Sequence, residues 1–211
     1  MVKIASMRRA AAVLLVGALA LGATPAAAAG LSRITDAGKA AILARPATPT
    51  AGPATADVTV VEYLDFNCGF CKKAAVSLRE LMAADPKVQV LYKDWPIFGG
   101  VSIYAARAAL AANWQGRYIA AHNILINTPA RLSSETLVRE RLAFAGVDLA
   151  QLDRDLATHG AAIDTILARN DAEARALNFS GTPGMVIGDY LIPGALGVED
   201  LRKLADAARA K

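Results

Sequence analysis

Cys68 and Cys71 lie at a junction between two segments whose apolar patterns predict different secondary structures. Residues 57–65 (DVTVVEYLD) are β-branched or aromatic and nearly apolar on both faces, as is typical of a central strand covered on both sides. Residues 68–84 carry an apolar stripe at helical spacing. Its members are Cys71, Ala74, Ala75, Leu78, Leu81 and Met82. With a second strand at 88–95, this order predicts a right-handed parallel crossover.

The rest of the chain predicts a helical block and then a hairpin. Amphipathic stretches without strand patterning fill residues 101–178, and glycine or proline residues separate them. A tight turn at Gly188 and Asp189 is predicted to join two short strands. The predicted helices are 103–114, 118–125, 135–144, 149–156, 163–177 and 198–210, and the predicted strands of the hairpin are 185–188 and 190–192. The order βαβ, helical block, ββα predicts an α/β fold.

The first 29 residues have the pattern of a cleaved secretory signal peptide. Three basic residues (Lys3, Arg8 and Arg9) precede an apolar run over 10–23, and small residues with several A-x-A sites follow. The alternative is an uncleaved membrane anchor, but an anchor needs about 20 apolar residues. This run is shorter and is followed by Pro25. We therefore expect a mature protein that begins near Gly30, lies in the periplasm and has no stable membrane insertion.

The predicted mature chain has little net charge and one domain. Loss of the signal segment removes three basic and no acidic residues, so the net charge falls from +4 to +1 and gives no argument for nucleic-acid binding. Residues 30–56 are interpreted as an arm, because the segment 46–53 is a proline-rich connector. Residues 57–211 are interpreted as the domain. Its core is expected to include Trp95, Trp114 and Phe144.

The cysteine pair is interpreted as a redox centre. A disulfide between residues three apart closes almost no loop and would add little stability. Zinc would need about four ligands, and the only histidines, His122 and His159, have no ligand-spaced partner, so neither metal nor cofactor is expected. A helix N-terminus favours a thiolate. Cys68 is therefore expected to be the exposed nucleophile, and Cys71, on the buried stripe, to resolve the mixed disulfide.

Two separated motifs carry a family resemblance. Residues 60–73 (VVEYLDFNCGFCKK) resemble the active-site segment of the DsbA family, and residues 181–188 (GTPGMVIG) resemble its cis-proline loop. Within that family, the chain is most similar to the Com1/ScsC-like subgroup. The resemblance implies a thioredoxin-like fold with an inserted helical subdomain and protein-disulfide oxidoreductase activity. It also implies that Pro183 follows a cis peptide bond beside the cysteines, with Thr182 before it, where an extended substrate segment pairs.

Glu62 is a further candidate for the site. It shares a strand face with Val58, Val60 and Leu64, so its carboxylate is expected to be buried. A buried carboxylate near the cysteines could accept the proton of Cys71, and the resemblance supports this role. The alternative is a structural ion pair with Lys93 on the neighbouring strand.

The direction of electron flow stays open at this point. Gly69, Phe70 and Thr182 are more similar to isomerase and reductase branches, whereas a proline-broken arm predicts a monomer, which favours a dithiol oxidase. The expected partners are exported cysteine-containing proteins and a membrane redox protein that resets the pair. A metal-binding or chaperone-like protein is the alternative from another class, and elemental analysis beside turnover of a model disulfide would separate the two.

Overall fold

The computed structural model describes residues 30–43 and 48–210. The predicted signal segment, residues 1–29, lies outside the described residues. In the part described, the chain folds around a mixed sheet of five strands in the order β1-β3-β2-β4-β5. The strands are β1 (Thr50–Ala51), β2 (Val58–Leu64), β3 (Val88–Asp94), β4 (Gly184–Ile187) and β5 (Tyr190–Pro193).

The two halves of the predicted topology meet in this sheet. Helix α2 (Gly69–Ala84) connects β2 to β3, which pair in parallel as predicted. Strand β4 pairs antiparallel with β2, and β5 pairs antiparallel with β4 through the turn after Ile187. Because β4 joins the other side of β2, the residues before Gly184 reach the end of β2 from which α2 begins. The predicted α/β fold, βαβ then ββα, is confirmed.

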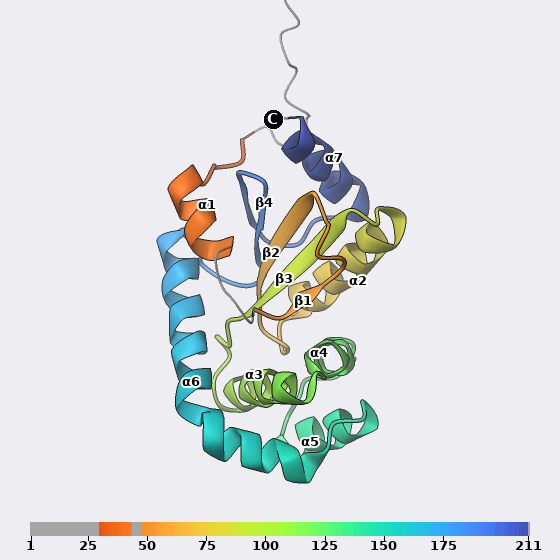
Figure 1. The fold of residues 1–211 in the computed structure, drawn as a ribbon, viewed down its shortest axis with the longest axis vertical. Helices are drawn as coiled ribbons and strands as arrows, with labels where there is room; N and C mark the ends of the chain where they lie inside the picture. The colour runs from red at the N-terminus through yellow and green to blue at the C-terminus, as the bar shows by residue number, and fades with distance from the viewer. Residues whose placement is uncertain (1–29, 44–47, 211) are drawn as a thin grey trace, which may run out of the picture.

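Helices cover both faces of the sheet, which explains why β2 and β3 are apolar on both sides. Figure 1 shows α2 and α7 (Val198–Arg209) on one side, and α1 (Asp36–Leu43) with the C-terminal half of α6 (Leu149–Ala176) on the other. The first face buries Val60 and Leu64 with α2 side chains. The second buries Val61 and Tyr63. Alternate residues of β2 therefore belong to two different cores.

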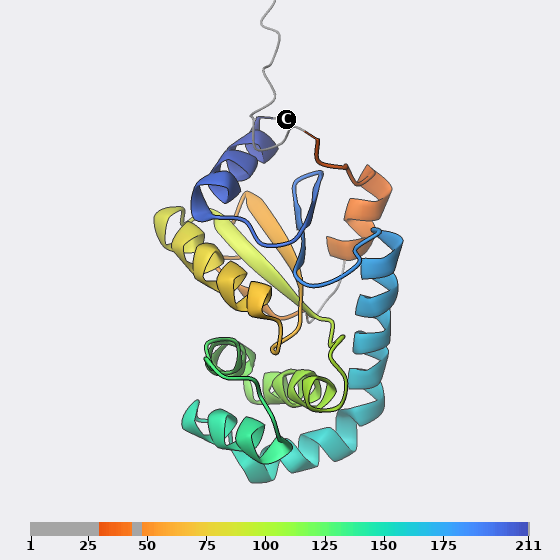
Figure 2. The same cartoon turned by 180° about the vertical axis from the view of Figure 1, so that it is seen from behind.

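The helical block lies at one end of the sheet. It contains α3 (Gly100–Ala112), a 3-10 turn (Asn113–Gln115), α4 (Tyr118–Ile126), α5 (Glu135–Phe144) and the first half of α6. Both views show α6 running from this block back along the sheet to α1 (Figures 1 and 2). No helix in the described residues is long and apolar enough to cross a membrane.

The prediction of a helix break at Gly160 is wrong. Helix α6 continues through it for 28 residues. A glycine inside a helix costs only about 1 kcal/mol relative to alanine. Leu152 before the glycine, and Ile163 and Leu167 after it, are all buried in one core. Apolar burial of roughly 1.5–3 kcal/mol per side chain exceeds that cost.

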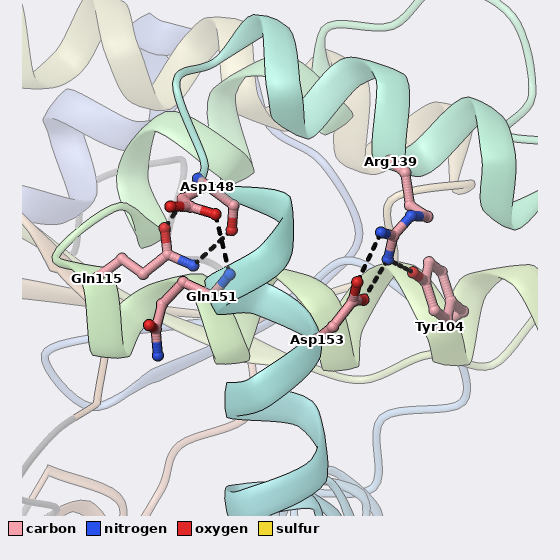
Figure 3. Close-up of polar contacts among 6 residues, drawn as sticks. All are labelled: Tyr104, Gln115, Arg139, Asp148, Gln151 and Asp153. Carbon is pink, nitrogen blue, oxygen red and sulfur yellow. Dashed lines mark hydrogen bonds and ion pairs between the residues drawn. The ribbon is translucent and has the colours of Figure 1, made fainter.

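Side-chain hydrogen bonds fix the turn between α5 and α6 (Figure 3). The Gln115 amide pairs with both backbone groups of Asp148: its Nε2 donates to the Asp148 carbonyl at 3.1 Å, and its Oε1 accepts from the Asp148 N–H at 3.0 Å. The Asp148 carboxylate then caps α6 by accepting from the Gln151 N–H. Nearby, Arg139 binds Asp153 through two nitrogens and donates to the Tyr104 hydroxyl.

Two expectations about the core are wrong. Trp95 is buried as predicted, but Trp114 is 45% exposed and stacks on His159, and Phe144 is 81% exposed at the end of α5. Amphipathic spacing fixes which residues share a helix face, but an aromatic ring at a helix end can extend past the packed face into solvent.

The segment 46–53 is not only a connector, although residues 46–47 lie outside the described part. Thr50 and Ala51 form the edge strand β1 on β3, and the Tyr92 N–H donates to the carbonyl of Pro49. Backbone pairing at a sheet edge needs no apolar side chain and tolerates flanking prolines. The composition of this segment therefore carried no signal for the strand.

Candidate functional site

Cys68 occupies the N-cap of α2, the position where helix N–H groups lack partners within the helix. Its backbone is extended, and its sulfur accepts from the Cys71 N–H at 3.4 Å. A side-chain acceptor at this position is the usual way to satisfy a helix N-terminus. Here the acceptor is a sulfur, so the same contact that caps the helix also favours the thiolate.

The loop before β4 forms the other side of the site. The Thr182–Pro183 peptide bond is cis, as the family resemblance implied. The Cys68 sulfur lies against this loop, 3.1 Å from the Thr182 carbonyl oxygen, to which it donates when it is protonated. The pairing of β4 with β2 thus brings together two motifs that are more than one hundred residues apart in the sequence.

The two thiols have opposite electrostatic surroundings. The pKa of Cys68 is lowered to about 6, chiefly by the hydrogen bond from Cys71, then by the Thr182 side chain and the first backbone N–H groups of α2, while burial opposes the shift. Burial raises the pKa of Cys71, and the contact with Cys68 raises it further. At neutral pH the pair therefore holds one thiolate on Cys68 and one proton on Cys71.

Cys68 is less exposed than the sequence predicts. Its exposed fraction is 3%, against 0% for Cys71. The thiol packs against the Thr182 carbonyl, so a residue at the open end of a helix is covered by a loop that the helix pattern cannot reveal. Its neighbours Gly69 and Phe70 are exposed, which leaves the approach to Cys68 at the protein surface.

Glu62 is buried on the same sheet face as Val60 and Leu64, as predicted, and is 1% exposed. Its Oε2 has no hydrogen-bond partner within the described part of the chain. Its pKa is raised to about 8, mainly by burial and then by the charges of Cys68 and Asp94. The group can therefore hold or release a proton near neutral pH.

The alternative of an ion pair between Glu62 and Lys93 is wrong. In the β2–β3 register Glu62 lies opposite Tyr92, so the Lys93 side chain is on the other face of the sheet. There the Lys93 Nζ binds Glu173 of α6 at 2.5 Å. The Tyr63 hydroxyl donates to the same carboxylate at 3.1 Å. The register decides this pairing, and strand spacing alone left it open.

Other buried polar groups near the site were not found from the sequence. Asp94, at the end of β3, accepts from the Tyr118 hydroxyl, and burial raises its pKa to about 7. His122 lies among the rings of Phe66, Tyr92 and Tyr118, and burial lowers its pKa to about 4, so it is neutral. No group of three or more possible metal ligands occurs among the residues the structure describes.

This geometry agrees with a comparison to protein families. The family model for the DsbA-like thioredoxin domain matches residues 59–206, which include both cysteines and Pro183. The chain belongs to the DsbA family. Its domain is therefore a DsbA-like thioredoxin domain, and its helical block is inserted between the two halves of a thioredoxin-like fold.

Solved structures of similar fold agree with membership of the DsbA family. A thioredoxin-like oxidoreductase from Silicibacter pomeroyi DSS-3 is 38% identical, with a TM-score of 0.77 over 82% of this chain and 98% of that one. The thiol-disulfide exchange protein alpha-DsbA2 from Wolbachia pipientis is 27% identical, with a TM-score of 0.74 over 80% and 90%. The catalytic domain of Proteus mirabilis ScsC is 26% identical, with a TM-score of 0.73 over 83% and 96%.

Curated relatives of this DsbA-family chain include much longer proteins. The Na(+)/H(+) antiporter NhaA 1 of Salinispora arenicola is 31% identical over 164 residues, which are 75% of this chain and 24% of the antiporter. A second antiporter, NhaA 3 of Salinispora tropica, is 33% identical over 71% of this chain and 23% of its own length. The chain thus spans about a quarter of the curated relatives it matches.

We expect Cys68, and not Cys71, to be alkylated in the folded, reduced protein. The labelling rate should rise with pH to half its maximum near pH 6, because the thiolate is the reactive form. Mass spectrometry after a short reaction with limiting iodoacetamide over pH 4–9 measures both sites. Labelling after unfolding, where both thiols react, is the control. Preferential labelling of Cys71 in the folded protein would contradict the assignment.

Proposed function

We propose that the chain is an exported thiol–disulfide oxidoreductase that exchanges disulfides with cysteine-containing proteins in the periplasm through Cys68 and Cys71. The observation that carries the proposal is the placement of Cys68. Its sulfur lies at the N-terminus of α2 with a pKa of about 6 and touches the Thr182 carbonyl, while Cys71 behind it is buried and protonated. The signal-peptide pattern of residues 1–29 supports export.

The proposed reaction in the oxidising direction has two exchange steps. A substrate thiolate attacks the Cys68 sulfur of the Cys68–Cys71 disulfide, forming a mixed disulfide and releasing Cys71 as a thiolate that takes up a proton. A second thiolate of the same substrate then attacks the substrate sulfur that is bonded to Cys68. This forms the substrate disulfide and releases Cys68 as a thiolate. The substrate loses two electrons to the cysteine pair. A membrane redox partner would reoxidise the pair, and the reverse sequence reduces a substrate disulfide.

Glu62 is proposed as the proton acceptor and donor for Cys71. In the reducing direction Cys71 must lose its proton before it can attack the mixed disulfide. Glu62 is the candidate for this base, because it is buried on the face of β2 that packs against α2, the helix of Cys71. Its pKa is about 8, and one of its oxygens has no hydrogen-bond partner within the described part of the chain. Pro183 and Thr182 are proposed to present their backbone to an extended substrate segment next to Cys68.

The proposed direction is dithiol oxidation by a monomer. A depressed Cys68 pKa stabilises the reduced pair and makes the disulfide more oxidising. Pro49 and Pro53 flank the two-residue strand β1, which leaves no room there for a long oligomerising helix. Isomerase or reductase activity is the second candidate, because Thr182 before the cis-proline and Gly69-Phe70 between the cysteines resemble those branches.

Paired assays on the chain without residues 1–29 test the direction. We expect it to oxidise reduced ribonuclease faster than it reactivates scrambled ribonuclease, because one redox site per molecule donates a disulfide but shuffles several poorly. Size-exclusion chromatography with light scattering should give the monomer mass. A stable dimer or trimer that reactivates scrambled ribonuclease efficiently would favour the isomerase. Absence of both activities would contradict the proposed function altogether.

A further inference from the structure

The side chain of Asn67, directly before Cys68, connects the cysteine turn to the helical block. Its Oδ1 accepts from the Leu132 N–H at 2.8 Å, and its Nδ2 donates to the Leu132 carbonyl at 3.2 Å. The same Nδ2 donates to the Ser102 hydroxyl at 3.1 Å. Leu132 belongs to the loop 127–134 between α4 and α5, and Ser102 lies in the first turn of α3. One amide therefore fixes two separate segments beside Cys68.

The hydrogen bonds continue to a buried carboxylate. Ser102 donates to Asp65 Oδ1 at 2.8 Å, and the Asn67 N–H donates to the same oxygen at 2.8 Å. The Phe98 N–H donates to Asp65 Oδ2 at 3.1 Å. All three contacts are donations to Asp65, so the chain of bonds runs in one direction, from the Asn67 amide through Ser102 to the carboxylate. A fully satisfied polar chain of this kind holds its members in one arrangement.

The loop 127–134 is attached again on the far side of the cysteines. Lys72, directly after Cys71, donates from Nζ to the carbonyls of Thr128 at 2.6 Å and Ala130 at 3.0 Å. Asn67 and Lys72 therefore bracket the motif, and each is bonded to backbone atoms of the same loop. Figures 1 and 2 show the N-terminal end of α2 beside α4, where this loop starts.

The segment 97–103, which is bonded to Asp65 through Phe98 and Ser102, exposes apolar side chains. Ile97, Phe98 and Ile103 are between 39% and 45% exposed. The loop 127–134, which the same Asn67 amide attaches, exposes Pro129 and Arg131. A thiol-exchange enzyme acts on unfolded or partly folded proteins, which expose extended apolar segments. The segment 97–103 and the loop 127–134 thus form two walls that can contact an extended polypeptide. A small dithiol contacts only the Cys68 sulfur.

We propose that Asn67 is a positioning residue that holds these two walls beside Cys68 and so determines the reactivity toward protein substrates. This inference rests on the proposed function. The contacts of the Cys68 sulfur, to the Cys71 N–H and the Thr182 carbonyl, do not involve the Asn67 side chain. Loss of the Asn67 amide should therefore loosen the attachment of both walls to the cysteine turn without changing the thiol, while Asp65 and Lys72 still hold their own contacts.

The test is Asn67→Ala, measured with two substrates that attack the same sulfur. The oxidised protein is mixed with reduced, unfolded ribonuclease or with dithiothreitol, and second-order rate constants are measured in single turnovers. We expect Asn67→Ala to lower the rate constant for ribonuclease about tenfold, as for the loss of one to two hydrogen bonds, and that for dithiothreitol less than about twofold. The alkylation midpoint of Cys68 should stay near pH 6.

Gln115→Ala is the matched control. Gln115 also pairs its amide with both backbone groups of one residue, Asp148, but at the α5–α6 turn (Figure 3). The Gln115→Ala variant should leave both rate constants unchanged.

Ser102→Ala is the second variant in case Asn67→Ala does not fold. It keeps the Asn67–Leu132 pair and should lower the ribonuclease rate constant by about threefold. Lys72 is not suitable, because its charge interacts with Cys68 directly.

The outcomes separate this inference from the proposed function. If the wild-type protein oxidises neither substrate, the proposed function is wrong. If it oxidises both, and Asn67→Ala slows both equally or neither, the positioning role is wrong and the function stands. An equally selective loss in Gln115→Ala, or a shifted alkylation midpoint in Asn67→Ala, would also overturn it.

Discussion

Replacement of Cys71 by serine is expected to trap substrate proteins as mixed disulfides on Cys68. In the reducing direction of the proposed reaction, Cys71 attacks the mixed disulfide as a thiolate and releases the substrate. Serine cannot perform this attack, but the hydrogen bond to the Cys68 sulfur from the backbone N–H of residue 71 remains. Cys68 therefore stays a competent thiolate, and a mixed disulfide that it forms with a substrate disulfide is no longer resolved by residue 71.

Cys68→Ser is the matched variant with the opposite result. It removes the nucleophile and leaves Cys71 buried and protonated. We expect turnover to fall by at least about a thousandfold in both variants. Only Cys71→Ser should give covalent adducts on non-reducing gels after expression with its signal segment. Equal ladders from both variants would show that the division into nucleophile and resolving cysteine is wrong.

The second large effect concerns Glu62→Gln, which should stabilise the reduced protein at alkaline pH. The pKa of Glu62 is about 8 in the folded protein, against an ordinary value of 4.5. The folded state thus holds a proton that the unfolded chain has already released. Stability from this group is complete below pH 4.5 and is lost as the pH rises to 8. Glutamine does not titrate, so the variant avoids this loss.

Urea unfolding of both reduced proteins at pH 5 and pH 8 measures the effect. The stability advantage of Glu62→Gln over wild type should grow by about 3 kcal/mol between these pH values. Glu140→Gln, at an exposed position of α5, controls for the amide substitution. An advantage that does not change with pH, or a loss of stability at pH 8, would show that Glu62 is not a buried, proton-holding group.

The same variant should be slower in one catalytic step. If Glu62 accepts the Cys71 proton, Glu62→Gln slows release of substrate from Cys68 by at least about a hundredfold, the usual size of general-base catalysis. The first attack by Cys68 should change much less. Stopped-flow measurement of both steps with a model disulfide separates them. A variant that is more stable yet resolves more slowly is not explained by a structural ion pair.

Local sequence patterns determined the cysteine helix and the central strands. The apolar stripe from Cys71 to Leu81 is buried as predicted, and β2 and β3 are covered on both faces. These patterns are informative because each depends on neighbours within one element, where backbone geometry fixes which side chains share a face. The same reasoning identified the N-terminal position of Cys68 and the burial of Glu62.

Only the tertiary structure decided which of these faces meet. The partner of Lys93 is Glu173, 80 residues away, because strand register turns Lys93 away from Glu62. The Thr182 carbonyl covers Cys68 because β4 joins β2. In the sequence Asn67 is an ordinary turn residue, because its partner Leu132 lies beside it only in the folded chain. Such contacts depend on long-range packing, and no spacing within a single segment encodes them.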